Sequence, residues 1–296
     1  MKRLDHRFAA GGALLLLALV ALPSAVSGQV LPTPAAFVRF FDLRCFRIPA
    51  PQPSLGVPLR LDHLNPYFVQ KGLPFELVDV KEPQDLCVPV YKENFQPTPD
   101  VRPFLQYADL KCYGITGPSL DLPLHLDQLN PVISGLFGPS LEVVVKEPQQ
   151  LCVPVYKNNV VPPPAIRQLI AWLDVKCYRI ETDQIVAGSI QLTHLNPLFA
   201  AIPPEKVDFV VQAPQQLCVP VMKNMTPPPP AVRPIVAYSD VLCYDILGQP
   251  LNQPLMLTHL NPVLVGMGLP PENVPVKATH KLCVPVAKNG FFPPAN

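Results

Sequence analysis

Leu86-Cys87-Val88-Pro89-Val90 is one of four identical strings that decide how this chain is organised. Each string reads Leu-Cys-Val-Pro-Val, and each has a lysine five residues after its cysteine. The other strings begin at Leu151, Leu217 and Leu282, and the four lysines are Lys92, Lys157, Lys223 and Lys288. Self-similarity at a fixed period predicts a repeat architecture in which one structural unit recurs.

Each repeat also begins alike. A first cysteine precedes each string, with an aspartate three residues before it and an aromatic residue directly after it. The first cysteines are Cys45, Cys112, Cys177 and Cys243, and the aspartates are Asp42, Asp109, Asp174 and Asp240. The tripeptide Leu-Asn-Pro lies midway, with its asparagine at Asn65, Asn130, Asn196 and Asn261. We therefore divide the chain into four β repeats, over residues 36–97, 103–162, 167–228 and 234–294.

The cysteine spacing confines length variation to the interior of each repeat. The two cysteines of a repeat are 42, 40, 41 and 40 residues apart, whereas the gap from one repeat to the next is always 25. The connections contain proline clusters, such as those at 162–164 and 227–230, and such segments favour extended, semi-rigid spacers. A loose linker of constant length and a fixed rise between modules both fit this pattern.

Short runs of alternating apolar residues indicate strands. Residues 57–61 and 76–80 place apolar side chains on one face, and residues 37–43 are rich in β-forming residues. Proline is too frequent for long helices, although a helical turn near residues 67–71 is compatible with the pattern. Pro89 lacks an N–H, which predicts an edge strand or a bulge. The expected fold is all-β, with four tandem small modules, each stapled by one disulfide and joined by proline-rich spacers.

The eight cysteines predict disulfides, because an even number of them recurs in small modules that follow an export signal. Closing a loop of about 40 residues contributes roughly 4 kcal/mol in the chain-entropy treatment. The expected bonds are Cys45–Cys87, Cys112–Cys152, Cys177–Cys218 and Cys243–Cys283. The constant gap also permits a second pairing that closes the modules into a ring, with bonds Cys87–Cys112, Cys152–Cys177, Cys218–Cys243 and Cys283–Cys45. No Cys-x-x-Cys pair typical of zinc sites occurs, so we expect no metal and no cofactor.

Three polar residues recur in every repeat. If the two cysteine strands are antiparallel neighbours with opposed cysteines, Asp42 and Lys92 lie on one face as diagonal neighbours. We expect an ion pair between them, worth about 1 kcal/mol or less if it is exposed. Asn65 precedes a proline, so we expect its side chain to bond to nearby backbone in a turn.

Residues suited to catalysis form no recognisable set. Three repeats have a histidine before Leu-Asn-Pro, whereas the second repeat has Gln128 there. These histidines are His63, His194 and His259. Asp62 and Asp127 precede this position in two repeats, which leaves a weak metal site as an alternative reading. Because nucleophile–base motifs and phosphate-binding loops are missing, we expect no catalytic residue and leave the binding residues unassigned.

The N-terminus has the pattern of a secretory signal peptide. Lys2, Arg3 and Arg7 precede an apolar run over residues 11–22, and small residues follow at 25–28. We expect residues 1–28 to be removed and the protein to be secreted, either outside the cell or into a periplasm. The run is shorter than the about 20 residues that span a bilayer, so no span is expected in the mature protein. The formal net charge of +1 argues against nucleic acid as a partner.

The repeat motifs resemble a family of tandem disulfide-containing domains in exported bacterial proteins. The matching residues are Lys111-Cys112-Tyr113, Asp127-Gln128-Leu129, and Leu151-Cys152-Val153-Pro154 with Lys157. The resemblance covers all four repeats, but in the middle element Leu-Asn-Pro replaces the family's Phe-Gly. The family is a domain of unknown function, so the resemblance implies export and β modules without an activity.

These observations predict an exported, non-catalytic structural or interaction protein with an unknown extracellular or cell-envelope ligand. The alternative is a module that binds a carbohydrate or a protein ligand, for which exposed aromatics at equivalent positions would be expected. The candidates are Tyr67, Tyr91, Tyr156, Trp172 and Tyr238, of which Tyr91 and Tyr156 are equivalent to each other. A hydrolase with a site at a module seam is a third reading, and it would require a polar cluster that breaks the repeat symmetry.

Overall fold

A computed structural model describes residues 30–296, so the predicted signal peptide at residues 1–28 lies outside the described residues. The described chain is predominantly β, as predicted, and its repeats share one pattern of strands. The first repeat has β1 (Asp42–Arg47), β2 (Val57–His63), β3 (Glu76–Val80) and β4 (Pro83–Lys92). The second has β5 (Asp109–Gly114), β6 (Leu122–Gln128) and β7 (Ser140–Lys157), in which the last two strands are continuous.

The third and fourth repeats follow the same order. The third has β8 (Val175–Glu181), β9 (Val186–His194), β10 (Glu205–Gln212) and β11 (Gln216–Lys223). The fourth has β12 (Val241–Leu247), β13 (Gln253–His259), β14 (Glu272–Val276) and β15 (Thr279–Lys288). Within each repeat, the first and last strands carry the cysteines, and the strands between them form a hairpin.

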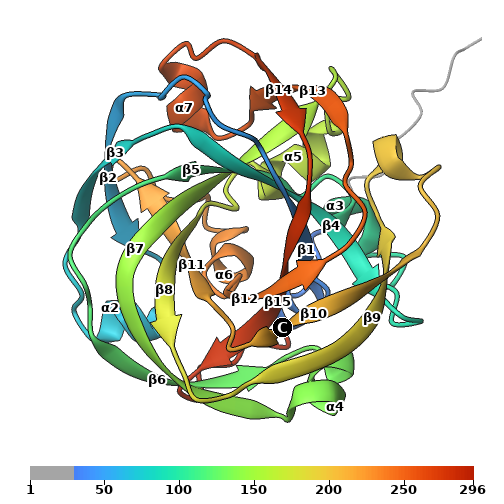
Figure 1. Cartoon of the computed structure of the whole chain (residues 1–296). Helices are drawn as coiled ribbons and strands as arrows, with labels where there is room; N and C mark the ends of the chain where they lie inside the picture. The colour runs from blue at the N-terminus through green and yellow to red at the C-terminus, as the bar shows by residue number, and fades with distance from the viewer. Residues whose placement is uncertain (1–29) are drawn as a thin grey trace, which may run out of the picture.

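The eight cysteine strands close into an antiparallel barrel (Figure 1). Each repeat supplies two neighbouring strands, and β15 returns to pair with β1. Cys45 faces Cys87 directly, whereas Cys87 faces Leu110, so the next repeat is offset by two residues. The same offset occurs at all four junctions, and four offsets of two residues give a shear of about eight for eight strands, which is a closed barrel. The repeats are therefore joined in a ring by backbone hydrogen bonds rather than arranged as separate beads.

Each hairpin forms backbone pairs with the opposite repeat in the ring instead of with the cysteine strands of its own. β2 of the first repeat pairs with β11 of the third, and β9 of the third pairs with β4 of the first. The second and fourth repeats make the same exchange, through β6 with β15 and β13 with β7. Figure 1 shows the hairpins around the central barrel. Apolar residues of the hairpins bury the outer face of the barrel, as where Leu59 and Val78 pack with Leu151 and Val153.

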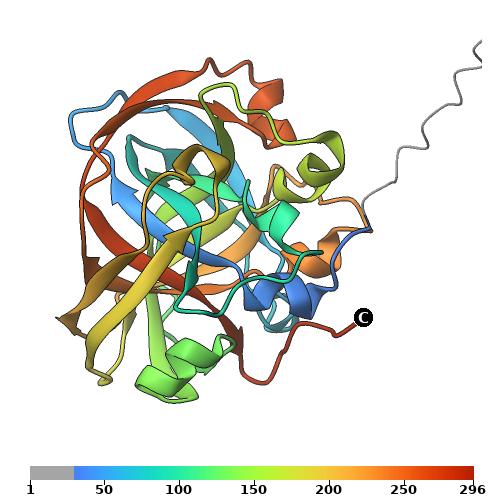
Figure 2. The same ribbon diagram turned by 90° about the vertical axis from the view of Figure 1, so that its right-hand side faces the viewer.

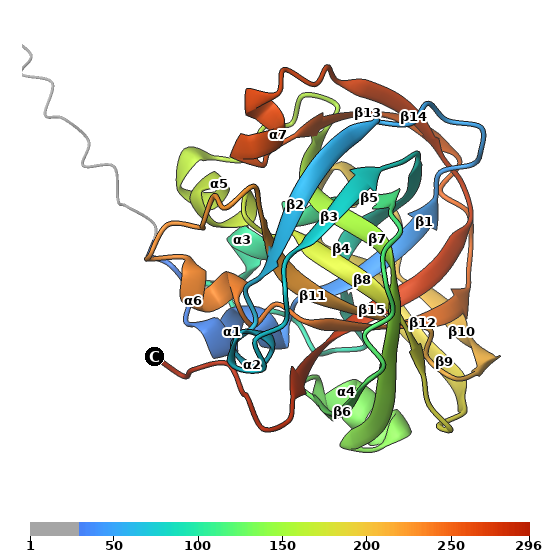
Figure 3. The same ribbon diagram turned by 90° about the vertical axis from the view of Figure 1, so that its left-hand side faces the viewer.

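The connections between repeats are not the extended spacers that the prolines suggested, because each contains a short helix. These helices are α3 (Arg102–Leu105), α5 (Pro164–Ile170) and α6 (Arg233–Val236), and a fourth, α1 (Pro34–Arg39), precedes β1. Proline occupies one of the first two positions of each, where its missing N–H costs no helical bond. Their apolar residues, such as Phe104 and Leu169, share one buried cluster with the cysteines. The helices gather at one end of the barrel (Figures 2 and 3) and close it.

Two local expectations were wrong. Residues 37–39 are helical rather than extended, because their apolar side chains are used to close the barrel end. Pro89 lies in neither an edge strand nor a bulge, since β4 is paired on both sides. Along one side of β4, however, the partner changes from β5, which pairs as far as Cys87, to β9, which begins at Val90. Pro89 lies between these two partners, where the strand pairing needs no N–H donor from β4.

A second set of short helices follows Leu-Asn-Pro, where the sequence allowed helical turns. They are α2 (Pro66–Gln70), α4 (Pro131–Phe137), the 3₁₀ helix η1 (Pro197–Phe199) and α7 (Pro262–Gly266). None of the helices within residues 30–296 has the length and apolar character to cross a membrane.

Candidate functional site

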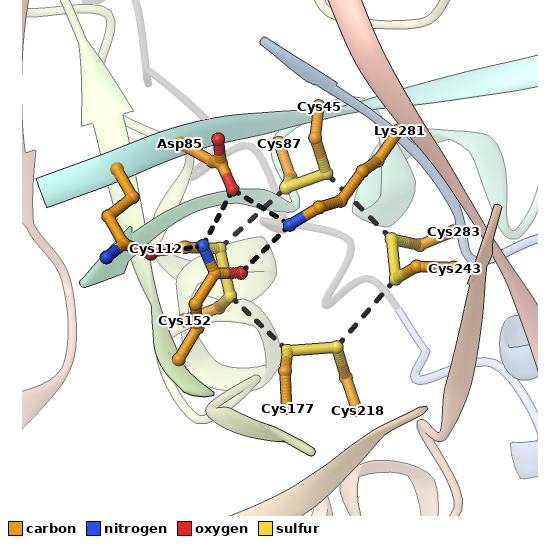
Figure 4. The surroundings of a disulfide bond; sticks show 12 residues. Cys45, Asp85, Cys87, Cys112, Cys152, Cys177, Cys218, Cys243, Lys281 and Cys283 are labelled. Carbon is orange, nitrogen blue, oxygen red and sulfur yellow. Dashed lines mark hydrogen bonds and ion pairs between the residues drawn. A yellow bond between two sulfur atoms is a disulfide. The ribbon is translucent and has the colours of Figure 1, made fainter. Parts of the chain in front are cut away.

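The disulfides join the two cysteine strands of each repeat, which confirms the predicted pairing. The bonds are Cys45–Cys87, Cys112–Cys152, Cys177–Cys218 and Cys243–Cys283. All eight sulfurs point into the barrel and form one ring (Figure 4). Sulfurs of neighbouring repeats lie 3.8 to 3.9 Å apart without a bond, so the second pairing predicted from the gaps corresponds to contacts rather than bonds. Four disulfides indicate folding in an oxidising, extracellular type of environment.

The helical end of the barrel carries the recurring aspartate, lysine and asparagine. Asp42 pairs with Lys92, as predicted, and the other three repeats have the same ion pair. The asparagine caps the helix that follows it: Asn65 Oδ1 accepts a hydrogen bond from the Tyr67 N–H at 3.0 Å. Its Nδ2 donates to Asp240 of the preceding repeat in the ring at 2.5 Å. The equivalent bonds occur in the other repeats, so the ring is closed by four identical Asp–Lys–Asn groups.

These ion pairs are buried rather than exposed, so the loss of one partner destabilises the fold more than the loss of a surface ion pair would. Asp42 is 2 % exposed and Lys92 is fully buried. Burial raises the pKa of Asp42 and lowers that of Lys92, in both cases against the attraction of the partner. For Asp240, burial raises the pKa to about 6 despite Lys288. Removing one partner of such a pair typically costs about 3–5 kcal/mol, so this end of the barrel is built for stability.

The histidines belong to a second set of buried groups, between the barrel and the hairpins. Lys176 on β8 contacts Glu76 of the opposite repeat's hairpin at 2.5 Å. Tyr178 also donates to Glu76 at 2.9 Å, and His63 lies 3.4 Å from the Tyr178 hydroxyl. Burial lowers the pKa of His63 to about 3, so the imidazole of His63 is neutral at neutral pH. The group formed by Lys111, Tyr113, Glu272 and His259 has the same arrangement.

The strand that the second repeat's hairpin covers explains why Gln128 stands where the other repeats have histidine. The second repeat's hairpin faces β12, where Leu242 occupies the position of Lys176. On that hairpin Leu141, paired with Leu126, replaces the glutamate, and Gln128 donates to the Tyr244 hydroxyl at 2.7 Å. The charged residues are thus absent together, which indicates a structural role for these histidines. Asp62 pairs with Arg60 and Asp127 with His125, and within residues 30–296 no group of three or more His, Cys, Asp or Glu is arranged to hold a metal.

The open end of the barrel, which we call the mouth, breaks the repeat symmetry. The residue two positions before the second cysteine points inward in each repeat and lines the space above the sulfur ring. The four residues at this position differ in charge: Asp85, Gln150, Gln216 and Lys281. Figure 4 shows Asp85 and Lys281 over the disulfides. No polar cluster that breaks the repeat symmetry was predicted from the sequence, yet these four residues form one.

The residues above the sulfur ring are bonded to one another. Lys281 Nζ lies 3.1 Å from Asp85 Oδ2 and donates to Gln150 Oε1 at 3.2 Å. Gln150 donates to Asp85 at 2.8 Å, and His280 Nε2 lies 2.6 Å from the other Asp85 oxygen. Burial alone raises the pKa of Asp85, but Lys281 and His280 more than offset this and keep it below its usual value. Asp85 is therefore ionised at neutral pH, although it is only 1 % exposed.

The mouth encloses a cavity of about 550 Å³. Three cationic and three acidic residues line it, namely Arg47, Arg179, Lys281, Asp85, Glu147 and Asp245, so their formal charges cancel. Five glutamines also line it: Gln84, Gln149, Gln150, Gln215 and Gln216. Gln216 is 6 % exposed, and its Oε1 accepts no hydrogen bond from the residues that the structure describes. The cavity thus presents many amide donors and acceptors with little net charge.

The aromatic candidates do not converge on this cavity. Tyr91, Tyr156, Trp172 and Tyr238 are partly buried against the helical end, and Tyr67 is 7 % exposed in a core cluster. The four mouth residues were not predicted from the sequence, because they differ between repeats and lack the recurrence that marks the other polar residues. A signal was present: the residue directly before each Leu-Cys-Val-Pro-Val string is polar in all four repeats but changes from aspartate to glutamine to lysine.

Comparisons of this chain with family models, with curated proteins and with solved structures found no match.

Proposed function

We propose that this is an exported, non-catalytic binding protein that takes a small, neutral, polyhydroxylated ligand, such as a sugar or sugar alcohol, in the barrel mouth. The observation that carries this proposal is the loss of repeat symmetry at the four positions Asp85, Gln150, Gln216 and Lys281. The Asp–Lys pairs at the helical end, by contrast, are the same in all four repeats. Mouths of β-barrels are common places for small-molecule sites.

The chemistry of the lining supports the ligand class. Amide side chains both donate and accept hydrogen bonds, which matches hydroxyl groups that do the same. The balanced charges favour a neutral ligand over an anion or a cation, and the volume lies in the usual range for small-molecule sites of about 300–1,000 Å³. A ligand hydroxyl that donates to Gln216 Oε1 would satisfy a buried acceptor that has no hydrogen-bond donor among residues 30–296.

A binding role fits the mouth better than hydrolysis does. The buried carboxylate, Asp85, is ionised by its contacts with Lys281 and His280, whereas a general acid needs a raised pKa. Export is supported by the signal-like N-terminus, by the four disulfides and by the resemblance to exported tandem domains.

Isothermal titration calorimetry on the oxidised protein tests the proposal. The panel contains neutral mono- and disaccharides and sugar alcohols, together with uronic acids, amino sugars and free amino acids. We expect binding of a neutral member, weakened at least about tenfold by Gln149→Ala, since one lost hydrogen bond in a dry site costs about 1–3 kcal/mol. The control is Arg102→Ala on α3 at the helical end, which should bind like the parent. Binding confined to charged members, no binding by the whole panel, or equal binding by Q149A would each overturn the proposal.

A further inference from the structure

We propose that the sulfur ring is a site of thiol–disulfide exchange, in which a small monothiol entering by the mouth converts the four disulfides within repeats into four disulfides between repeats. This inference is independent of the sugar-binding proposal, because it rests on the sulfurs and not on the glutamines. The product has the pairing Cys87–Cys112, Cys152–Cys177, Cys218–Cys243 and Cys283–Cys45.

The first support is the alternation of bonds and contacts around the ring. Every sulfur is bonded to one neighbour and lies 3.8 to 3.9 Å from a sulfur of the next disulfide on its other side. Disulfides exchange when a thiolate attacks a sulfur of another disulfide. A thiolate released anywhere in this ring therefore already touches the bond that it would attack.

The exchange balances without an oxidant or reductant. The monothiolate bonds to Cys45 Sγ, and the Cys45–Cys87 bond breaks with its electron pair leaving on Cys87. Cys87 then bonds to Cys112 and releases Cys152 as a thiolate. The same step repeats through Cys177 and Cys218 and through Cys243 and Cys283. Finally Cys283 attacks Cys45 and expels the original thiolate. Four disulfides are present before and after, and the monothiol is regenerated.

The sulfurs are buried directly beneath the mouth, so a monothiol reaches them from this side when the hydrogen-bonded side chains of Asp85, Gln150 and Lys281 move aside. Gln150, Gln216 and Lys281 line both the mouth cavity and the small apolar chamber that the sulfurs surround. Lys281 is also the strand partner of Cys45 on β1. A nearby ammonium group favours the thiolate over the thiol, so an attacking or departing thiolate at this part of the ring is stabilised. The helical end is closed by the packed residues of α1, α3, α5 and α6, which leaves the mouth as the side of entry.

The experiment is disulfide mapping after exposure of the folded protein to 2-mercaptoethanol without oxygen. Remaining thiols are alkylated, and the peptides are mapped without reduction. We expect links between cysteines 25 residues apart, such as Cys87–Cys112, while circular dichroism shows the barrel intact. If only the original links and alkylated cysteines are found, the proposal is wrong. Treatment in guanidinium provides the reference, because the unfolded chain should also form links between non-neighbours such as Cys45 and Cys177.

A ring-opened variant gives a second, sharper readout. In the double variant Cys45→Ser, Cys87→Ser, exchange that starts at Cys112 runs through the remaining sulfurs to Cys283, and exchange that starts at Cys283 runs back to Cys112. Mass spectrometry should then find the mercaptoethanol adduct on one of these two end cysteines and the alkylated thiol on the other, in equal amounts. Adducts spread evenly over the six cysteines would contradict exchange around the ring. If this variant does not fold, the map of the parent protein still decides the proposal.

Discussion

The two ends of the barrel are built from the same repeats but treat the repeat symmetry in opposite ways. At the helical end, aspartate, lysine and asparagine recur in all four repeats and make the same contacts. At the mouth, the equivalent inward positions hold Asp85, Gln150, Gln216 and Lys281. Residues that only stabilise the fold can be the same in every repeat, whereas a single site on the barrel axis needs different groups around it. The comparison supports a stabilising role for the helical end and our proposal of ligand binding at the mouth.

The largest effect is expected at the helical end. Lys157→Met leaves Asp109 buried without its counter-charge, and such a loss costs about 3–5 kcal/mol. Guanidinium unfolding followed by circular dichroism measures it. The double variant Asp109→Leu, Lys157→Met should recover most of this loss, since the pair is replaced by apolar groups. If the free energy of unfolding falls by less than about 1 kcal/mol in the single variant, the helical end does not have the stabilising role that we assign to it.

At the mouth, a smaller cost is expected from a similar change. Lys281→Gln removes one partner of Asp85, but His280 and Gln150 still contact that carboxylate. We expect a loss of about 1–3 kcal/mol, the usual penalty for a buried group that loses one partner. The same unfolding measurement, run beside K157M, ranks the two ends. If K281Q proves more damaging than K157M, the assignment of stability to the helical end is wrong.

The buried histidines predict a dependence of stability on pH. The pKa of His63 and of His194 is lowered to about 3, first by burial and then by nearby cations. The unfolded chain therefore binds more protons between pH 6.5 and 3, and stability falls as the pH falls through this range. The expected slope is about 1.4 kcal/mol per pH unit for each histidine. His63→Gln, which copies Gln128 of the second repeat, should reduce the slope, and an unchanged slope in unfolding curves at pH 4–6 would refute this origin.

The smallest effect is expected from Arg47→Ala. Arg47 is exposed in the mouth cavity, and it forms no ion pair with the residues that the structure describes. The free energy of unfolding should change by about 0.5 kcal/mol or less, as for most surface substitutions. Arg102→Ala at the other end is the matched control. A large loss of stability in R47A alone would mean that the mouth, too, is built for stability.

The sequence was sufficient for features that lie within one repeat. Alternation around the cysteines predicted the strands, the equal spacings predicted the disulfides, and odd offsets from the cysteines placed Asp42 and Lys92 on one face. Features between repeats could not be read in this way. The pairing of β15 with β1 and the exchange of hairpins depend on where a strand finds its next partner, which a repeat's own pattern does not encode. The helices at the closed end were not predicted, because a short apolar segment fits a strand as well as a helix. Only the packing of these residues in the barrel end distinguishes the two.

The most direct test makes the mouth symmetric. The double variant Asp85→Gln, Lys281→Gln places glutamine at all four positions and removes the buried ion pair as a unit. Its unfolding free energy and its titration with the sugar panel are measured together. The account predicts stability within about 1 kcal/mol of the parent, since replacing a whole buried pair is often nearly neutral, together with at least tenfold weaker ligand binding. A variant that binds the ligand as the parent does, or one whose barrel unfolds, would contradict the division of the molecule into a stabilising end and a binding end.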